Sequence, residues 1–252
     1  SITPNTTAIM PIHVYGHPCE VDAIEEIAKK NNLRVIYDAA HAFGVKCHCG
    51  SILQHGDISV LSFHATKVFN TFEGGAIICK DRSIKKKIDE FKNFGFSSQT
   101  TAEQIGINAK MSEFNAALGL LQLKQIDRDI EKRKSIDEKY RKLLKEIPGI
   151  RCHIKSKTER SNYSYFPIFV DSKYHTTRDQ LYEKLKDNGV FARRYWYPLI
   201  TDFFVYQHSS NNKEKILINA EKVANTALCL PIYSELKHES IVYWHIISFV
   251  IS

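Results

Sequence analysis

The first third of the chain carries the hydrophobic pattern of a βαβ unit. Residues 8–14 and 33–37 are short apolar runs, and residues 20–31 between them repeat apolar positions at helical spacing. Strands joined by a crossover helix run parallel, and open α/β sheets bind ligands at the carboxyl ends of their strands. The pattern therefore predicts that Asp38, which follows the second run, lies at a binding edge.

A lysine lies between the next two apolar runs. Residues 58–63 and 76–79 indicate strands, and the loop between them contains Lys67 and ends in Gly74-Gly75. An acid at one strand end and a lysine beyond another fit a pyridoxal phosphate site, in which the lysine forms the Schiff base and the acid pairs with the pyridinium nitrogen. Either residue alone would favour a solvated lysine and a helix-capping aspartate.

The centre of the chain is predicted to be helical. Ser112 is a candidate N-cap for a long helix that turns Phe114 and Leu121 inward. A densely charged helix follows and runs to residue 147, where Pro148-Gly149 breaks the pattern. We therefore expect a domain boundary at this Pro-Gly pair.

The expected boundary gives a domain of residues 1–147 and a smaller α+β domain of residues 148–252. In the second part the pattern alternates between short strands and helices. The predicted strands and helices there cover residues 163–170, 177–188, 190–197, 212–228 and 234–250.

Composition excludes several function classes. The 252 residues are 43% apolar, enough for a sizeable core, and no apolar run has the 18 or more residues of a membrane span. The formal charge of +7 is spread over helices that also carry acids, and no aromatic-interleaved basic stripe indicates nucleic acid. Six scattered cysteines are typical of free thiols in a reducing compartment, so we expect a cytoplasmic protein.

The run Cys47-His48-Cys49 raises the question of a metal site. No second ligand pair follows at a spacing typical of zinc. The sequence therefore favours a hairpin tip here, and no metal is predicted.

Three ordered blocks resemble the DegT/StrS family of sugar aminotransferases, and the resemblance covers nearly the whole chain. The blocks are Asp38-Ala39-Ala40-His41-Ala42-Phe43-Gly44, Ser62-Phe63-His64-Ala65-Thr66-Lys67 with Glu73-Gly74-Gly75, and Gly106-Ile107-Asn108-Ala109-Lys110-Met111-Ser112-Glu113. The resemblance implies an α/β, fold-type I, pyridoxal-phosphate-dependent transferase. On this basis the chain holds part of the large domain, with a mainly parallel sheet, and a small α+β C-terminal domain.

The resemblance also implies five cofactor residues. Lys67 is the catalytic residue and binds the cofactor, Asp38 pairs with the ring nitrogen, and the Ser62 hydroxyl binds the phosphate. His41 contacts the ring or its phenolic oxygen. Asn108 reaches the phosphate of a partner subunit, which implies a homodimer with shared active sites. From the residues alone, a structural histidine and a turn asparagine remain alternatives for the last two.

Two further residues are candidates for the substrate. Arg194 and Tyr195 lie in an aromatic and basic cluster that approaches the substrate in relatives. Arginines that extend from a strand rim are the alternative. For His64, packing or support of its neighbours is favoured over a role as catalytic base, because Lys67 already serves as the base.

The function that the resemblance implies is transfer of an amino group from an amino acid, typically glutamate, to a nucleotide-linked keto-deoxy sugar. The run around Lys67 is most similar to members that act on dTDP-4-keto-6-deoxyglucose at C4. Amination of a dTDP-3-keto-6-deoxyhexose at C3 and a non-catalytic fragment or interaction domain are the alternatives. Relatives begin with a segment that carries a phosphate loop and a stacking aromatic residue, so we expect this chain to be N-terminally truncated.

Overall fold

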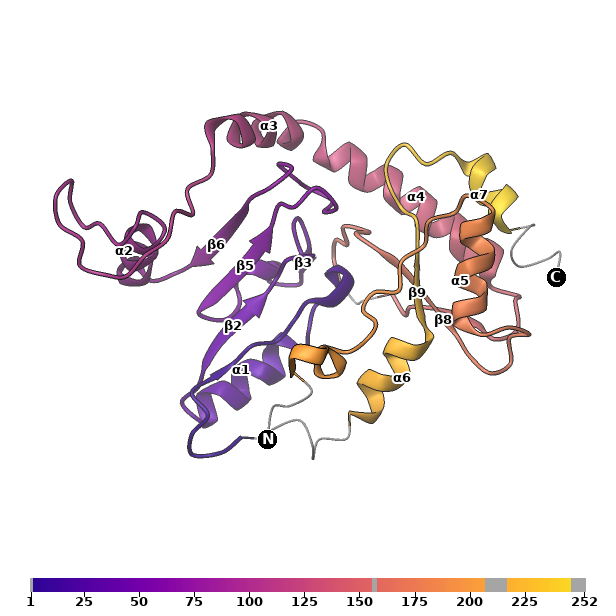
Figure 1. Cartoon of the computed structure of the whole chain (residues 1–252), viewed down its shortest axis with the longest axis horizontal. Coiled ribbons are helices and arrows are strands. Elements are labelled where there is room, and N and C mark those ends of the chain that lie inside the picture. Colours follow the sequence, from indigo (N-terminus) through magenta and orange to yellow (C-terminus); the bar gives the residue numbers. More distant parts are fainter. Residues whose placement is uncertain (1, 156–157, 207–216, 246–252) are drawn as a thin grey trace. The chain divides into compact units, whose positions relative to one another are not determined.

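The computed structural model describes residues 2–155, 158–206 and 217–245 (Figure 1). The chain forms two compact units. Unit 1 comprises residues 1–128 and 156–164, and unit 2 comprises residues 129–155 and 165–252. No described helix is long and apolar enough to cross a membrane.

Unit 1 is an α/β unit. Its elements are β1 (Ala8–Ile9), η1 (Val14–Gly16), α1 (Val21–Lys30), β2 (Arg34–Asp38), β3 (Lys46–Cys47), β4 (Gly50–Ser51), η2 (Ile52–Gln54), β5 (Ile58–Ser62), β6 (Gly75–Cys79), α2 (Arg82–Phe91) and α3 (Glu113–Leu123). The long helix α4 (Ile126–Leu144) begins in unit 1 and continues into unit 2.

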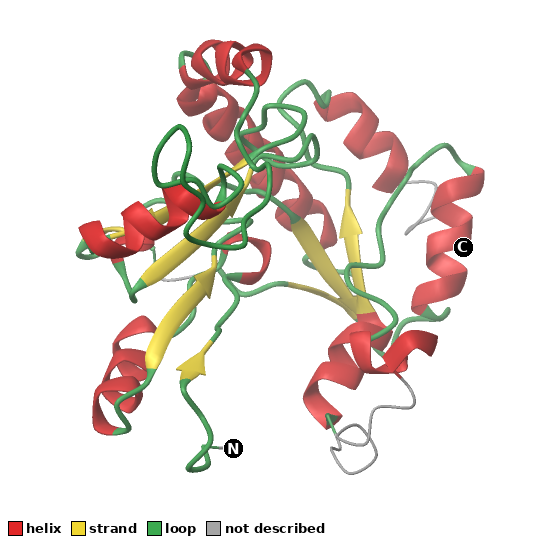
Figure 2. Cartoon of the chain, turned by 60° about the vertical axis from the view of Figure 1, so that its left-hand side comes forward, coloured by secondary structure: helices red, strands yellow, loops and turns green. Residues whose placement is uncertain are grey.

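The main sheet of unit 1 has the strand order β1-β2-β5-β6. β1, β2 and β5 are parallel, and β6 is antiparallel to β5 (Figures 1 and 2). The prediction of a βαβ unit with parallel strands is confirmed, and Asp38 is the last residue of β2, as expected. Of the other residues that the prediction included in the first strand, Ile12 forms an isolated parallel bridge with Asp38, and Val14 begins η1.

The core of unit 1 lies beneath this sheet and the β3–β4 hairpin. Burial of apolar side chains supplies most of the favourable free energy of such a unit. The buried members are Val21, Ala28, Val35, Tyr37, Ala39, Ala42, Val45, Cys47, Ile52 and Leu61. This core fixes the carboxyl ends of β2 and β5, from which the candidate site is built.

Helix α3 differs from its prediction. Ser112 caps it as expected, because its hydroxyl accepts a hydrogen bond from the backbone N–H of Asn115 at 3.2 Å. Phe114 and Leu121, which were predicted to point inward, are exposed. Only Gly119 of this helix is buried, and it lies close to Thr71 and Phe69 of the lysine loop.

Unit 2 is built around a three-stranded antiparallel sheet of order β7-β8-β9. Its elements beyond α4 are β7 (Ile150–Cys152), β8 (Phe166–Val170), α5 (Arg178–Asp187), η3 (Ile200–Asp202), η4 (Phe204–Tyr206), α6 (Ile218–Thr226), β9 (Ala227–Leu230) and α7 (His238–His245). All residues of β8 and β9 are buried.

Two predictions for unit 2 are wrong in part. Residues 227 and 228 were assigned to a helix but begin β9, because buried Arg178 donates to the carbonyl oxygens of Ala224 and Ala227 (both 2.9 Å) and ends α6 there. Residues 190–197 form no strand and contribute only an isolated bridge between Arg193 and Cys229. The predicted helical residues 212–216 and 246–250 lie outside the described residues.

The division of the chain also differs from the expected boundary at Pro148-Gly149. Most of α4 belongs to unit 2, because its residues Ile136, Tyr140 and Leu144 are part of that unit's hydrophobic core. The Tyr140 ring stacks on Phe166 of β8 with centroids 4.7 Å apart. Side-chain packing of α4 therefore places the boundary between the units near the start of α4 and not at Pro148-Gly149.

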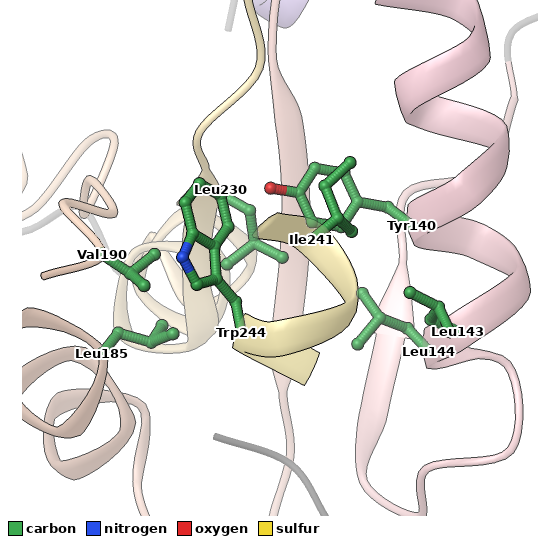
Figure 3. Close-up of a pocket in the computed structure, with 8 residues that line it drawn as sticks. All are labelled: Tyr140, Leu143, Leu144, Leu185, Val190, Leu230, Ile241 and Trp244. Atoms are coloured by element: carbon green, nitrogen blue, oxygen red, sulfur yellow. The ribbon is translucent and has the colours of Figure 1, made fainter. Parts of the chain in front are cut away.

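A small apolar recess lies within this core (Figure 3). Its lining residues are Tyr140, Leu143, Leu144, Leu185, Val190, Leu230, Ile241 and Trp244. Its volume of about 10 Å³ is close to that of a single water-sized sphere. The recess is therefore part of the core packing and too small for an organic ligand.

Candidate active site

The candidate site begins where two neighbouring parallel strands end. Asp38 closes β2 and Ser62 closes β5, and the register pairs Asp38 with Val60. The carboxyl ends of adjacent parallel strands share one sheet edge, where α/β sheets bind their ligands. The loop from β5 to β6 carries Lys67 at the same edge.

Hydrogen bonds within the loop fix the backbone around Lys67. The Lys67 N–H donates to the His64 carbonyl oxygen at 2.9 Å, and the Thr71 N–H donates to the Phe63 carbonyl oxygen at 2.9 Å. The buried Thr71 hydroxyl donates to the Glu73 carbonyl oxygen at 2.7 Å. These bonds fix the backbone on both sides of the lysine.

Three phenylalanines from two segments form an aromatic cluster below this loop. Phe43 stacks on Phe69 at 4.2 Å between centroids, and Phe63 meets Phe69 edge to face at 4.9 Å. Aromatic pairs of these geometries stabilise by roughly 0.5–1.5 kcal/mol beyond the area they bury. The cluster anchors the lysine loop to the turn after β2, since Phe63 and Phe69 flank Lys67 in the sequence and Phe43 belongs to that turn.

The Lys67 ammonium is partly removed from water. Burial lowers its pKa below the ordinary value for lysine, and the negative charge of Asp38 opposes that shift. An opposite charge raises a lysine pKa only when it lies nearby. The structure therefore brings the predicted catalytic lysine and the predicted ring-pairing acid into electrostatic contact.

Asp38 is oriented by the chain that follows it. Its Oδ1 accepts a hydrogen bond from the Ala40 N–H at 3.0 Å. The turn that contains Ala39 and Ala40 is buried or half-buried, so the carboxylate has little freedom to turn away. A carboxylate has two oxygens, and this bond occupies a site on only one of them.

His41 is buried and neutral. Its Nδ1 accepts a hydrogen bond from the Tyr15 N–H at 3.2 Å, which assigns the ring proton to Nε2. Burial and the positive charge of Lys67 lower the pKa of His41 to about 4. At neutral pH its Nε2–H is therefore a hydrogen-bond donor that carries no charge.

Asn162 supports the His41 turn and was not found by the sequence reasoning. Its side-chain amide is fully buried and donates to the carbonyl oxygens of His41 at 2.7 Å and Phe43 at 2.9 Å. Gly16 packs against the same groups, because a Cβ there would lie 2.6 Å from the Asn162 Oδ1. A buried asparagine far along the chain gives no signal in a local sequence pattern.

Gly74 and Gly75, at the end of the loop between β5 and β6, have a steric role. Gly74 has a φ of +149°, and a Cβ there would lie 2.7 Å from Met111 Cε. A Cβ on Gly75 would lie 2.7 Å from the Leu61 carbonyl oxygen. A side chain at Gly75 would push β6 away from β5, and one at Gly74 would collide with Met111 and Thr71, so the glycines allow the loop to close tightly after Lys67.

Ser62 and His64 lie at the start of the lysine loop. The Ser62 hydroxyl accepts from the His64 N–H at 3.3 Å. The His64 Nδ1 accepts from the Thr66 N–H at 3.2 Å, and its Nε2 lies 3.9 Å from a Glu73 carboxylate oxygen. These contacts agree with a supporting role for His64, and the phosphate role of Ser62 stays a prediction.

Asn108 lies in a different environment from the other cofactor candidates. It pairs with Asn93 in an isolated bridge, and its side-chain oxygen accepts from Lys110 Nζ at 3.0 Å. Its side chain is exposed, and the segment after α2 extends away from the strands (Figure 1). The described contacts do not place Asn108 against Asp38 or Lys67 of its own chain.

Arg194 and Tyr195 belong to unit 2. The Arg194 guanidinium donates to Asp179 Oδ1 at 2.9 Å and lies over the Tyr182 ring at 4.4 Å. This hydrogen bond to Asp179 raises the Arg194 pKa. Tyr195 stacks on Trp196 with ring centroids 4.9 Å apart. Their role toward a substrate stays a prediction.

Comparison with known proteins decides the family. The model of the DegT/DnrJ/EryC1/StrS aminotransferase family matches residues 1–246. The chain belongs to this family. The resemblance found in the sequence is thereby confirmed, and so is the α/β fold class expected of a DegT/StrS aminotransferase.

Curated relatives of this DegT/StrS chain carry the name dTDP-4-amino-4,6-dideoxy-D-glucose transaminase. The chain is 52% identical to the one from Shigella dysenteriae and 48% identical to the one from Escherichia coli. Each match covers 96% of the chain and 66% of the relative. The chain thus spans about two thirds of the length of these curated relatives.

Solved structures agree with this assignment to the DegT/StrS family. The structure of DesI in the presence of its TDP-sugar product matches with a TM-score of 0.90 at 31% identity, over 98% of this chain and 62% of that one. Helicobacter pylori PseC, an aminotransferase of pseudaminic acid biosynthesis, matches with a TM-score of 0.90 at 27% identity, over 100% of this chain and 69% of that one.

Proposed function

We propose that the protein is a pyridoxal-phosphate-dependent aminotransferase that transfers an amino group from an amino acid to a nucleotide-linked keto-deoxy sugar. The observation that carries this proposal is the partly desolvated Lys67, held by a rigid loop within the field of Asp38 at the carboxyl edge of the sheet. Family membership and the transaminase relatives support it.

The substrate class follows from the relatives. Two relatives, 52% and 48% identical to this chain over 243 aligned residues, are named for a dTDP-linked 4-amino-4,6-dideoxyglucose. We therefore propose dTDP-4-keto-6-deoxyglucose, aminated at C4, as the acceptor and glutamate as the donor. Transfer to C3 of a dTDP-3-keto-6-deoxyhexose is the outcome that product analysis would have to exclude.

The residues at the sheet edge fit pyridoxal phosphate. When bound, this group supplies an electron sink that accepts electron density from the reacting substrate carbon. Asp38 would hold the proton on the ring nitrogen, since its carboxylate is fixed by Ala40 and keeps acceptor capacity. Ser62 would offer its hydroxyl to the phosphate. The proposed cofactor site thus uses side chains from the ends of two adjacent strands.

Lys67 would hold the cofactor covalently through Nζ and then act as the base. A lysine needs a neutral fraction to do either, and burial lowers its pKa in that direction. Nζ would take the proton from Cα of the amino donor and return one in the second half-reaction. The packed rings of Phe43, Phe63 and Phe69 would hold the loop that carries this lysine in place.

His41 would contribute a fixed, uncharged donor. Its Nε2–H can donate to an oxygen of the cofactor ring without adding a second positive charge beside Lys67. A charged imidazolium here would lower the lysine pKa further and repel the ring proton held by Asp38. The Tyr15 N–H and the buried Asn162 keep the ring and its turn in place.

A homodimer with shared sites is part of the proposal. Asn108 is exposed and lies in a segment that extends from the sheet, where it could reach a partner's cofactor phosphate. In the same stretch of the chain, large apolar side chains are exposed at Ile105, Ile107, Phe114, Leu120 and Leu121. Exposed apolar surface of this extent is typical of protein–protein interfaces.

Borohydride trapping tests the role of Lys67. The chain incubated with pyridoxal phosphate and then reduced should carry one pyridoxyl group, and peptide mapping should locate it on Lys67. The Lys67→Ala variant should lose the label. The Lys110→Ala variant, which removes an exposed lysine of the same unit, should keep it. A label on another lysine in the unaltered chain would refute the proposed site.

Asp38→Asn tests the electron sink. The amide oxygen can keep the hydrogen bond to Ala40 N–H, but a neutral amide cannot hold the ring proton by charge. A loss of about 4 kcal/mol of transition-state stabilisation corresponds to a rate about 10³-fold lower. Stopped-flow absorbance of each half-reaction should show this loss, with the circular dichroism spectrum unchanged. Near-normal rates would make Asp38 a structural residue.

Mixing variants tests the shared sites. A heterodimer of Lys67→Ala and Asn108→Ala chains places both defects in one site and leaves the other intact, because the partner supplies Asn108. The mixture should regain part of the activity that the parents lack. Activity that stays at the average of the two parents would show that each site is made by one chain.

A further inference from the structure

A cluster of sulfur and nitrogen ligands lies in unit 1 outside the proposed active site. The Sγ atoms of Cys47 and Cys49 are 3.0 Å apart. The Nε2 of His55 lies 3.3 Å from the first sulfur and 3.1 Å from the second. A ring nitrogen of His48 lies within 4.8 Å of both sulfurs. The Cys47, Cys49 and His55 ligand atoms therefore converge on one point, and a ring nitrogen of His48 lies near both thiols.

A tight hairpin presents three of these ligands. β3 and β4 pair antiparallel, with Cys47 opposite Gly50, so that His48 and Cys49 form the two-residue connection of a tight hairpin. Gly50 has a φ of +108°, a conformation that glycine adopts without strain. The hairpin predicted from the sequence is confirmed.

A short 3-10 helix brings the histidine back to the hairpin. Ile52 is fully buried, and its N–H donates to the Val45 carbonyl oxygen at 3.2 Å. The Ser51 hydroxyl caps the helix by accepting from the Leu53 N–H at 3.4 Å. His55 follows at the end of that helix, so its position rests on a buried anchor. The sequence spacing indicated no further ligand, and the fold brings His55 to the two thiols.

The ligand types are those of a structural zinc site. Zinc binds thiolate sulfur at about 2.3 Å and imidazole nitrogen at about 2.0–2.1 Å in tetrahedral geometry. Ligand atoms in such a tetrahedron lie roughly 3.5–3.8 Å apart. The observed separations of 3.0, 3.1 and 3.3 Å need to open by less than about 1 Å, which side-chain rotation provides.

We propose that Cys47, Cys49 and His55, with His48 as the fourth ligand, bind a Zn²⁺ ion that fastens the β3–β4 hairpin to the turn before β5. Cys49 is exposed and Cys47 is buried, so the ion can enter from solvent and reach the inner sulfur. This site is independent of the proposed transaminase activity, because none of its ligands belongs to the cofactor site.

Cobalt titration of the reduced chain tests the proposal. One Co²⁺ per chain should produce a thiolate-to-metal charge-transfer band and the intense visible bands of tetrahedral coordination, and one equivalent of Zn²⁺ should remove them. Zinc affinity is then measured by competition with a chromophoric chelator. X-ray absorption of the zinc form should show two sulfur and two nitrogen neighbours.

Variants assign the ligands. A change in the groups that merely support a ligand costs about 10–100-fold in metal affinity, so loss of a ligand should cost at least about 100-fold. Cys49→Ser and His55→Asn should each weaken Zn²⁺ binding to that extent. The matched control Cys152→Ser removes a half-buried thiol outside the cluster and should leave the affinity unchanged.

Three results would overturn the assignment. A chain that binds no stoichiometric Co²⁺ has no such site. Zinc affinity that is unchanged in Cys49→Ser or in His55→Asn places the ion elsewhere. Unchanged zinc affinity in His48→Asn would show that His48 is not the fourth ligand. Because Cys49 and His48 are exposed, these variants should fold, and circular dichroism of the metal-free chains confirms it.

Discussion

The central strands of unit 2 bury their apolar residues, whereas residues 91–123 of unit 1 expose most of theirs. In unit 2, every residue of β8 and β9 is buried, and one continuous core links them to α4, α5 and α7. In unit 1, the segment of residues 91–123 leaves its large apolar side chains in solvent. The exposed ones are Phe91, Phe94, Phe96, Ile105, Ile107, Met111, Phe114, Leu120, Leu121 and Leu123.

The difference shows which part of the chain can be stabilised by its own residues. At roughly 25 cal/mol per Å² of apolar area buried, a core such as that of unit 2 supplies most of the favourable free energy of folding. The exposed side chains of α3 contribute no such free energy unless a partner surface buries them. A second copy of the chain is the partner that the proposed shared site requires.

The largest expected effect is that of Phe166→Ala in unit 2, to be compared with Phe114→Ala in α3. Phe166→Ala removes a ring that is 1% exposed and stacked on Tyr140. Loss of a buried phenylalanine typically lowers the free energy of unfolding by about 3–5 kcal/mol. Hydrogen exchange of unit 2 peptides, read by mass spectrometry, should show this loss. A change below about 1 kcal/mol would mean that the core is not the source of the stability.

Acid should weaken unit 1 through two buried histidines. Burial lowers the pKa of both His13 and His41 to about 4, with His55 adding to the shift at His13 and Lys67 to that at His41. Between pH 6.5 and 4 the unfolded chain therefore binds more protons, so stability is full above the unfolded pKa and falls as pH drops. The loss from pH 7 to pH 5 is roughly 2 kcal/mol for each histidine.

The variant His13→Gln sharpens this expectation. It should remove about half of the pH dependence of unit 1, because only His41 then remains to be charged on unfolding. Hydrogen exchange of unit 1 peptides at pH 7 and pH 5, in both proteins, measures the difference. Equal pH dependence in the two proteins would show that His13 is protonated in the folded state.

Asn162→Ala should have an intermediate effect on unit 1. The change leaves the carbonyl oxygens of His41 and Phe43 without their buried donor, and an unsatisfied buried acceptor costs about 1–2 kcal/mol. Hydrogen exchange of unit 1 peptides over a range of urea concentrations gives the number. Ser161→Ala, which changes an adjacent hydroxyl, is the matched control and should shift the midpoint little.

The smallest expected effect on stability is that of Phe114→Ala. The ring is 75% exposed, so its loss should change the free energy of unfolding of the single chain by less than about 0.5 kcal/mol. The same change should weaken self-association, which sedimentation velocity over a range of concentrations detects. A cost similar to that of Phe166→Ala would show that α3 is buried within its own chain.

Local patterns in the sequence determined much of the fold and the placement of Asp38 and Lys67, the proposed central pair of the site. The apolar run that ends in Asp38, the helical spacing before it and the loop with Lys67 are all encoded within short stretches, because strand and helix periods differ and strand ends place ligands. Ser112 as the N-cap of α3 and the hairpin at Cys47 were likewise predicted and confirmed.

Tertiary structure decided the rest, because it depends on contacts between residues far apart in the chain. The face that α3 buries, the attachment of α4 to unit 2 and the end of α6 at Arg178 follow from packing that no local period encodes. Asn162 joins the His41 turn from 121 residues away. His55 meets the two thiols only because η2 folds the chain back onto the hairpin.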